Sequence, residues 1–234
     1  MFNINHALAN GGISRLEQYD VENIEKELLD ENFKLKITSI ESIKSFEPDA
    51  LRFFMWKYGI YSMPTEQLIK SLRDILGNTS KCLEIGAGNG VYGRSLDIKM
   101  TDNYMQHPKN DRKFRGVVTS YIQQGQPLVS YGDDVEEMDG KESVRLYKPE
   151  TVFCSWVTQK YNPMQHEKGG NMFGVDFDWI FKRKSVKRVV MIGNEAVHQY
   201  HPIATNSKTI KLKTPHLISR ASKPELDRIY ILEV

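Results

Sequence analysis

The stretch KCLEIGAGNGVYGRSL, residues 81–96, places three glycines on alternate positions directly after a short apolar run. The apolar run has the length of a buried β-strand, and the residues after Gly90 can continue as a helix. Glycines at a strand-to-helix turn let the backbone approach a ligand closely, and the first N–H groups of the helix are free to bind it. The stretch therefore predicts a cofactor or phosphate site in an α/β protein.

Two common glycine-rich loops do not fit this stretch. A dinucleotide loop needs G-x-G-x-x-G, but counting from Gly86 and Gly88 puts Val91 where the third glycine should stand. The phosphate-binding loop that ends in Gly-Lys-Ser/Thr does not match either. What remains is an acidic residue, Glu84, followed after one spacer by glycines at every second position.

This pattern resembles the first motif of the class I S-adenosylmethionine-dependent methyltransferases. The resemblance covers residues 58–157 with usable motifs and extends by strand order to the C-terminus. It implies that Glu84 contacts the methionine amino group, often through water, and that the cofactor lies over the glycines. A carboxylate suits a cationic amine, because charge-assisted hydrogen bonds are shorter and stronger than neutral ones. The cofactor residues implied here are Glu84, Gly86, Ala87, Gly88, Asn89 and Gly90.

Two further cofactor contacts are implied by the resemblance. The second predicted strand ends on Asp102, where the family carries an acidic residue that holds both ribose hydroxyls. An ionised carboxylate only accepts hydrogen bonds, so it can take two O–H donors at once. Asp97 is the alternative, although it precedes the strand. After the third predicted strand, Asp134 and Val135 are expected at the adenine, with Asp133 as the neighbouring alternative.

The acceptor site of such a fold lies at the carboxyl ends of the strands, near the exit of the fourth strand. Enzymes that methylate amino groups of DNA bases carry Asp/Asn/Ser-Pro-Pro-Tyr/Phe there, whereas this chain has Ser155-Trp156-Val157-Thr158. A small molecule or a protein is therefore expected as acceptor rather than a DNA base. The candidate acceptor contacts are Tyr61, Ser62, Thr65, Ser155 and Trp156, and the candidate catalytic residues are His166, His198 and Tyr161.

The remaining reactive side chains predict no metal site and no cysteine nucleophile. Cys82 and Cys154 each lie in an apolar strand-like run, which suits reduced core thiols. His198 and His201 form a His-x-x-His pair without a recognisable third ligand. The basic run at residues 181–188 is expected to be a solvated helix end before an edge strand; the alternative is a phosphate contact.

Short apolar runs alternate with longer polar stretches after residue 78, which predicts βα units and a mainly parallel sheet. Strands are predicted at residues 81–86, 98–101, 127–132, 151–157, 188–193, 216–221 and 228–234. Helices are predicted at residues 21–29, at 47–61, from Pro64 or Thr65 to Gly77, and at 139–147. The fold class is therefore α/β: a doubly wound, Rossmann-like seven-stranded sheet with an N-terminal helical extension. The extension is placed at residues 1–57 and the S-adenosylmethionine-binding domain at residues 58–234.

The amino-acid composition is consistent with this fold and does not indicate a substrate. At 234 residues, 40% hydrophobic and 26% charged, the chain can bury one large core. A net charge of +2 gives no global basic field that would require a nucleic acid. No leader pattern and no apolar window of membrane-spanning length is present, so a cytoplasmic protein is expected.

Together these features predict a methyltransferase with an unidentified acceptor. One alternative is a non-catalytic cofactor-binding or interaction module. Another is a nucleic-acid methyltransferase guided by the run at residues 181–188. The sequence predicts no membrane partner, and it does not determine the oligomeric state.

Overall fold

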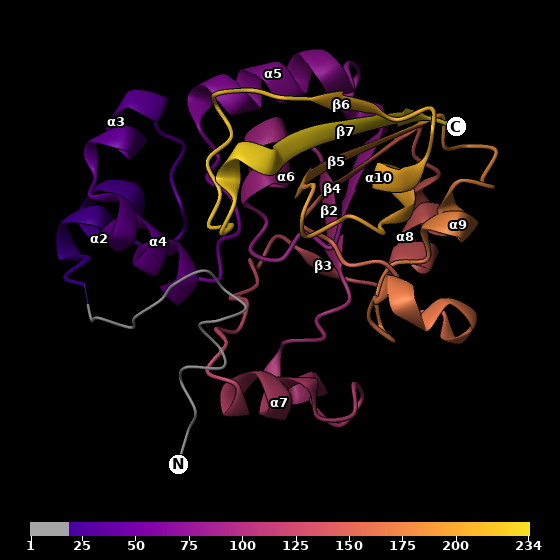
Figure 1. Ribbon diagram of the computed structural model, residues 1–234, viewed down its shortest axis with the longest axis horizontal. Helices are drawn as coiled ribbons and strands as arrows, with labels where there is room; N and C mark the ends of the chain where they lie inside the picture. Colours follow the sequence, from indigo (N-terminus) through magenta and orange to yellow (C-terminus); the bar gives the residue numbers. More distant parts are fainter. Residues whose placement is uncertain (1–18) are drawn as a thin grey trace.

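The computed structural model describes residues 19–234, which fold around a seven-stranded sheet with the order β3-β2-β1-β4-β5-β7-β6 (Figure 1). The strands are β1 (Cys82–Ile85), β2 (Lys99–Asp102), β3 (Glu136–Glu137), β4 (Thr151–Ser155), β5 (Arg188–Asn194), β6 (Ile210–Leu212) and β7 (Asp227–Glu233). Strands β1 to β5 pair in parallel, and β7 pairs antiparallel with both β5 and β6. The predicted doubly wound α/β sheet is confirmed.

Helices cover both faces of this sheet, as the parallel pairing requires. Two apolar clusters form there, because successive side chains of a strand point to opposite faces. In β5, Val190 and Ile192 belong to the cluster under α5 (Glu66–Leu76) and α6 (Val91–Leu96). Val189 and Met191 belong to the cluster under α8, α9 and α10. These three helices span Gly140–Tyr147, Phe177–Ile180 and Pro202–Thr205.

The N-terminal helices form a smaller cluster of their own beside the sheet, drawn in indigo in Figure 1. They are α2 (Glu22–Leu28), α3 (Ile40–Ser45) and α4 (Pro48–Lys57). Pro48 begins α4 and Glu47 caps it by accepting from the Ala50 N–H at 2.6 Å. The short helix α3 was not predicted. A helical extension before the sheet is therefore present, and its boundary at residues 57 and 58 stays a prediction.

Two predicted strands are wrong. Residues 127–132 form no strand; the partner of β2 is β3, where Glu136 pairs with Thr101 and Glu137 with Asp102. Residues 216–221 form no strand either, and the sheet edge is β6 instead. The apolar residues of both runs made them resemble strands, but the second run bonds to the segment before α5: Met63 N donates to Ile218 O at 2.8 Å.

The connection between β2 and β3 is the largest departure from the predicted organisation. It carries the unpredicted helix α7 (Val117–Gln123), which stands away from the sheet at the bottom of Figure 1. None of the helices within residues 19–234 is long and apolar enough to cross a membrane. The segment searched for a leader pattern falls almost entirely within residues 1–18, outside the described residues.

Candidate active site

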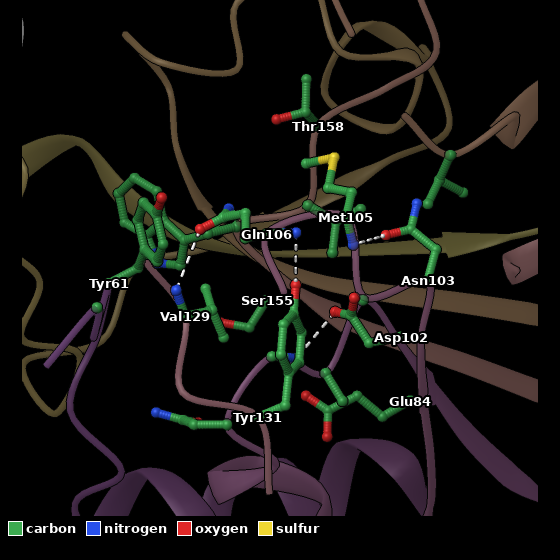
Figure 2. Close-up of a pocket in the computed structure, with 18 of the residues that line it drawn as sticks. Tyr61, Glu84, Asp102, Asn103, Met105, Gln106, Val129, Tyr131, Ser155 and Thr158 are labelled. Carbon is green, nitrogen blue, oxygen red and sulfur yellow. Dashed lines mark hydrogen bonds between the residues drawn. The ribbon is translucent and has the colours of Figure 1, made fainter. Parts of the chain in front are cut away.

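A pocket opens at the carboxyl ends of β1, β2 and β4 (Figure 2). It is also lined by the segment before α5, by the β2–β3 connection and by the loop after β4. Ten of the predicted site residues line it: Tyr61, Ser62, Glu84, Gly86, Ala87, Gly88, Asn89, Asp102, Ser155 and Trp156. The predicted residues outside its lining are Gly90, Thr65, Asp134, Val135, His166, His198 and Tyr161.

The turn between β1 and α6 needs glycine on both conformational and steric grounds. Gly86, Gly88 and Gly90 all have positive φ, at 64°, 57° and 76°. A Cβ at Gly86 would lie 2.6 Å from Val157 Cγ2, and one at Gly90 would lie 2.7 Å from Val135 Cγ2. Residues that carry a Cβ rarely adopt positive φ, so only glycine allows a turn this tight.

Glu84 is a buried acidic residue, and one of its carboxyl oxygens forms no hydrogen bond. Its side chain lies in the pocket lining but is only 1% exposed, and its Oε2 has no hydrogen-bond partner. Burial raises the pKa of Glu84 to about 8, although a hydrogen bond from the Gly93 N–H opposes the rise. A positively charged ligand group would satisfy the free oxygen and restore the charged form.

Asp102, the last residue of β2, points into the same pocket (Figure 2). Its Oδ2 accepts from the Gly88 N–H at 3.0 Å, and its Oδ1 accepts from the Tyr104 N–H at 2.9 Å. Burial raises the pKa of Asp102, and these backbone donors oppose the rise. Each oxygen keeps a lone pair for a ligand hydroxyl. Asp97, the alternative, is exposed at the C-cap of α6 and outside the pocket.

Asp134 and Val135 lie outside the pocket lining. Asp134 accepts two hydrogen bonds from Arg94, at 2.7 and 2.6 Å, and Val135 packs in a small apolar cluster beside the glycine turn. The cause is the later position of β3. The residues that follow the observed strand are Met138 and Asp139, and both line the pocket.

The β2–β3 connection supplies further lining residues that the sequence did not reveal. The Tyr131 hydroxyl accepts from the Gln106 N–H at 3.1 Å, and the Gln106 side chain accepts from the Val129 N–H at 3.2 Å (Figure 2). The Tyr131 ring stacks on Tyr104 with centroids 4.1 Å apart. No local pattern could identify these residues, because their approach to β1 depends on the path of the whole connection.

Aromatic side chains form the side of the pocket beyond β4. The rings of Tyr61 and Trp156 stack with centroids 5.9 Å apart and planes at 25°. Ser62 Oγ lies 2.7 Å from the Tyr92 hydroxyl, and both residues line the pocket. Thr65 instead caps α5: its fully buried hydroxyl accepts from a helix N–H and donates to a backbone carbonyl.

The candidate catalytic residues do not enter this pocket. His198 is buried, its Nδ1 accepts from the Asn194 N–H at 3.0 Å, and burial lowers its pKa to about 4. Its ring contacts Trp156 from behind the lining, with centroids 5.4 Å apart. Tyr161 and His166 lie on the exposed loop after β4. The described lining therefore offers no histidine as a base.

The basic run at residues 181–188 lies at the opposite end of the sheet from the pocket. It leads into the amino end of β5, whereas the pocket is at the carboxyl ends. β5 is an interior strand between β4 and β7, so the expected edge strand is wrong. Arg188 pairs with Glu233 at 2.6 Å, and Lys187 with Glu150 at 3.2 Å.

The cysteines and the histidine pair occupy the core. Cys82 and Cys154 are free and buried, and they belong to the apolar clusters on opposite faces of the sheet. His201 is fully buried, and burial lowers its pKa to about 3. Within residues 19–234, no three His, Cys, Asp or Glu side chains are grouped so that they could hold a metal ion.

The chain matches no protein-family model and no curated protein sequence. Similar solved structures include ErmE, a 23S rRNA methyltransferase, at 11% identity and a TM-score of 0.34, covering 72% of this chain and 67% of that one. A Streptococcus pneumoniae protein provisionally assigned as a tRNA methyltransferase is 8% identical, with a TM-score of 0.35 and coverage of 74% and 71%. It has also been solved in complex with S-adenosyl-L-methionine.

A third match is the ribosomal protein L11 methylase of Lactobacillus delbrueckii subsp. bulgaricus, at 11% identity and a TM-score of 0.32, covering 71% of this chain and 77% of that one. The names of these proteins describe them as methyltransferases, provisionally in the case of the Streptococcus pneumoniae protein. The fold itself rests on the observed sheet order with its antiparallel β7. The names of these proteins give an rRNA, a tRNA and a ribosomal protein as acceptors, so the expectation that disfavours a nucleic-acid acceptor stays a prediction.

Proposed function

We propose that this chain binds S-adenosylmethionine in the pocket and transfers its methyl group to an acceptor that enters beside Trp156. The observation that carries the proposal is the free, buried Oε2 of Glu84 in the same pocket as Asp102. One carboxylate suits an ammonium group and the other suits a diol, and S-adenosylmethionine carries both on one molecule. The narrow glycine turn between them leaves backbone surface for the cofactor to lie on.

The cofactor contacts follow from this arrangement. Glu84 would bind the methionine amino group and Asp102 the ribose hydroxyls. For the adenine we propose the Asp139 carboxylate instead of Asp134 and Val135, because Asp139 follows the observed β3 and lines the pocket. The Met138 N–H is not available, since it donates to Asp102 O at 2.8 Å. Asp139 already accepts from the Lys141 N–H at 2.8 Å as the cap of α8, which fixes its orientation.

Bound in this way, S-adenosylmethionine would supply an electrophilic methyl carbon on a sulfonium. The chain's own task is then to hold the acceptor in line with that carbon and to exclude water. Tyr61 and Trp156 can orient an acceptor through their ring faces, and the hydroxyl of Ser155 can do so by hydrogen bonding. Small-molecule, protein and nucleic-acid acceptors all remain in the proposal, as does the alternative of a non-catalytic binding module.

Calorimetry provides the first test. S-Adenosylmethionine and S-adenosylhomocysteine should bind the purified protein, and NAD should not. The protein is then incubated with methyl-labelled cofactor and separate pools of small metabolites, proteins, RNA and DNA. Label transferred to one pool supports the enzyme, whereas binding without transfer to any pool supports the non-catalytic module. Binding of NAD alone would contradict the proposal.

A further inference from the structure

Arg220 is a partly buried cation, and one nitrogen of its guanidinium is enclosed by the protein. Its backbone N–H donates to Tyr61 O at 3.1 Å, and its guanidinium carbon lies 4.1 Å from the centre of the Tyr61 ring. The Nη1 atom is buried and has no hydrogen-bond partner. Within residues 19–234, no carboxylate comes within ion-pair distance of this side chain. A buried donor of this kind is costly unless a ligand pairs with it.

The ring beside Arg220 belongs to the pocket. Tyr61 lines it and stacks on Trp156, and Tyr121 lines it from α7. Burial raises the pKa of the Tyr121 hydroxyl, and the nearby positive charge of Arg220 opposes that rise. Three aromatic rings therefore gather at one end of the pocket, beside a guanidinium that forms no ion pair with any residue from 19 to 234.

The backbone at Trp156 adds a second indication that this end binds a ligand. Trp156 has a φ of 57°, a left-handed conformation that bulky residues rarely adopt. Such strain persists where the surrounding structure holds it, and it is concentrated at binding and catalytic sites. The residue directly follows β4, which is the place of the acceptor in the proposed function.

The charged side chains near the two ends of the pocket have opposite signs. The lining contains three carboxylates, those of Glu84, Asp102 and Asp139, and no lysine or arginine. These carboxylates suit the ammonium and hydroxyl groups proposed for the cofactor. Arg220 is not part of the lining and lies behind Tyr61 at the aromatic end of the pocket. Its positive charge does not suit those cofactor groups, so it is available to a negatively charged group of a second ligand.

We propose that Arg220 binds a carboxylate or phosphate of the methyl acceptor, while a planar part of the acceptor lies against Tyr61 and Trp156. This inference rests on the proposed function and names the class of its substrate: an aromatic or heteroaromatic oxyanion. Arginine suits the task because its planar fork binds such groups through two hydrogen bonds and remains charged while stacked on a ring. Ring faces attract a second ring as well as a cation.

The test uses three probes of similar shape, namely benzoate, phenyl phosphate and neutral benzamide. Each is titrated by ligand-observed NMR into protein saturated with S-adenosylhomocysteine. At least one anion should bind about tenfold or more tighter than benzamide, the scale of a charge-assisted hydrogen bond. Comparing benzoate with phenyl phosphate distinguishes a carboxylate acceptor from a phosphate acceptor.

Arg220→Gln should abolish this preference and leave S-adenosylhomocysteine affinity unchanged. The matched control is Arg183→Gln, because Arg183 also stacks on a ring, that of Trp179, at 4.1 Å, but outside the pocket. The control should keep the preference. Arg220→Lys is a second variant, which retains the positive charge. It should therefore keep part of the preference for anions.

Three results would overturn the inference. They are an anion preference that persists in Arg220→Gln, a loss of S-adenosylhomocysteine affinity in that variant, and no binding of either anion to the native protein. The second result would assign Arg220 to the carboxylate of the cofactor. If S-adenosylhomocysteine does not bind the native protein, the proposed function fails, and the titration without it still measures whether Arg220 selects an anion.

If both Arg220 variants fail to fold, the native protein is labelled with phenylglyoxal and mapped by mass spectrometry. Benzoate should slow labelling of Arg220 and leave labelling of Arg183 unchanged. Equal labelling of Arg220 with and without benzoate would contradict the inference.

Discussion

The Gly88 N–H donates to Asp102 Oδ2 at 3.0 Å, so the end of β2 holds the glycine turn that follows β1. The other oxygen of the same carboxylate accepts from the Tyr104 N–H. Asp102 therefore both shapes the turn and faces the pocket. Its substitution is expected to affect the cofactor site in two ways at once.

Asp102→Asn should weaken S-adenosylhomocysteine binding by about 1.5–3 kcal/mol, the scale of hydrogen bonds to a charged group. An amide has one oxygen, so its NH₂ group would have to face the N–H of Gly88 or Tyr104. Calorimetry measures the loss. Asp97→Asn is the control, because Asp97 is exposed, outside the pocket, and in a left-handed conformation that asparagine tolerates. Equal affinity in both variants would remove Asp102 from the site.

Glu84 should make the stability of the cofactor-free protein depend on pH. Its pKa is raised to about 8 from a usual value of 4.5, so the folded state binds the extra proton between these values. The unfolded state binds fewer protons there, and the free energy of unfolding contributed by Glu84 falls as pH rises through this window. Urea unfolding at about pH 5.5 and pH 8 should show a smaller fall in Glu84→Gln than in the native protein.

The same carboxylate should release a proton when the cofactor binds near neutral pH. An ammonium group beside Glu84 favours its charged form, so the proton must leave. Calorimetry in buffers with different ionisation enthalpies detects this release, and Glu84→Gln should reduce it. An identical proton count in both proteins would mean that Glu84 does not meet the amino group.

The sequence predicted the parts of this site that depend on local order. β1, the glycine turn and Asp102 follow one another along the chain, and their residue types fix both the turn and its acidic neighbour. β3 could not be predicted in this way, because it consists of Glu136 and Glu137 and has no apolar signal. Its place is decided by pairing with β2, and the misplaced strand put the adenine prediction on residues outside the pocket lining.

Arg220 escaped prediction for a different physical reason. It reaches Tyr61 only because Ser219 pairs with Ser62 in an isolated bridge between distant parts of the chain. The apolar pattern around it predicted a strand of the main sheet, and an arginine at the end of a strand does not by itself indicate a binding site. That its buried Nη1 has no partner in the described part of the chain becomes evident only from the packing of the folded protein.

Gly86→Ala should cost more than its backbone conformation alone explains. Gly116 also has a positive φ, 81°, in the left-handed region, but a Cβ at Gly116 meets nothing within 4 Å. A Cβ at Gly86, where φ is 64°, would lie 2.6 Å from Val157 Cγ2, on the loop that closes the pocket. Gly116→Ala should therefore lower stability by about 1 kcal/mol, and Gly86→Ala by more, with weaker cofactor binding. Equal losses in thermal unfolding would mean that Val157 yields without cost.

Neutralising the basic run should leave the site intact. Replacing Lys182, Lys184 and Lys187 with glutamine removes three exposed charges at the amino end of β5. Because the pocket lies at the carboxyl ends, cofactor affinity and transfer to any acceptor should be unchanged. If RNA or DNA is methylated and its binding weakens in this triple variant, the nucleic acid must extend around the molecule to this surface.

Cys154 should be dispensable for chemistry although it lies in β4, next to the residues that enter the pocket. It is fully buried, and burial raises the pKa of its thiol, so the nucleophilic thiolate is not formed at neutral pH. Cys82 cannot pair with it, because Cys82 is opposite Thr151 in the parallel register and the two thiols lie on opposite faces of the sheet. Cys154→Ala should therefore cost about 1 kcal/mol of stability, by lost packing, and keep native cofactor affinity. Cys82→Ala is the control from the other face. Mass spectrometry after incubation with cofactor and cytosine-containing DNA checks the chemistry: a covalent adduct at Cys154 would mean that the thiol acts as a nucleophile after all.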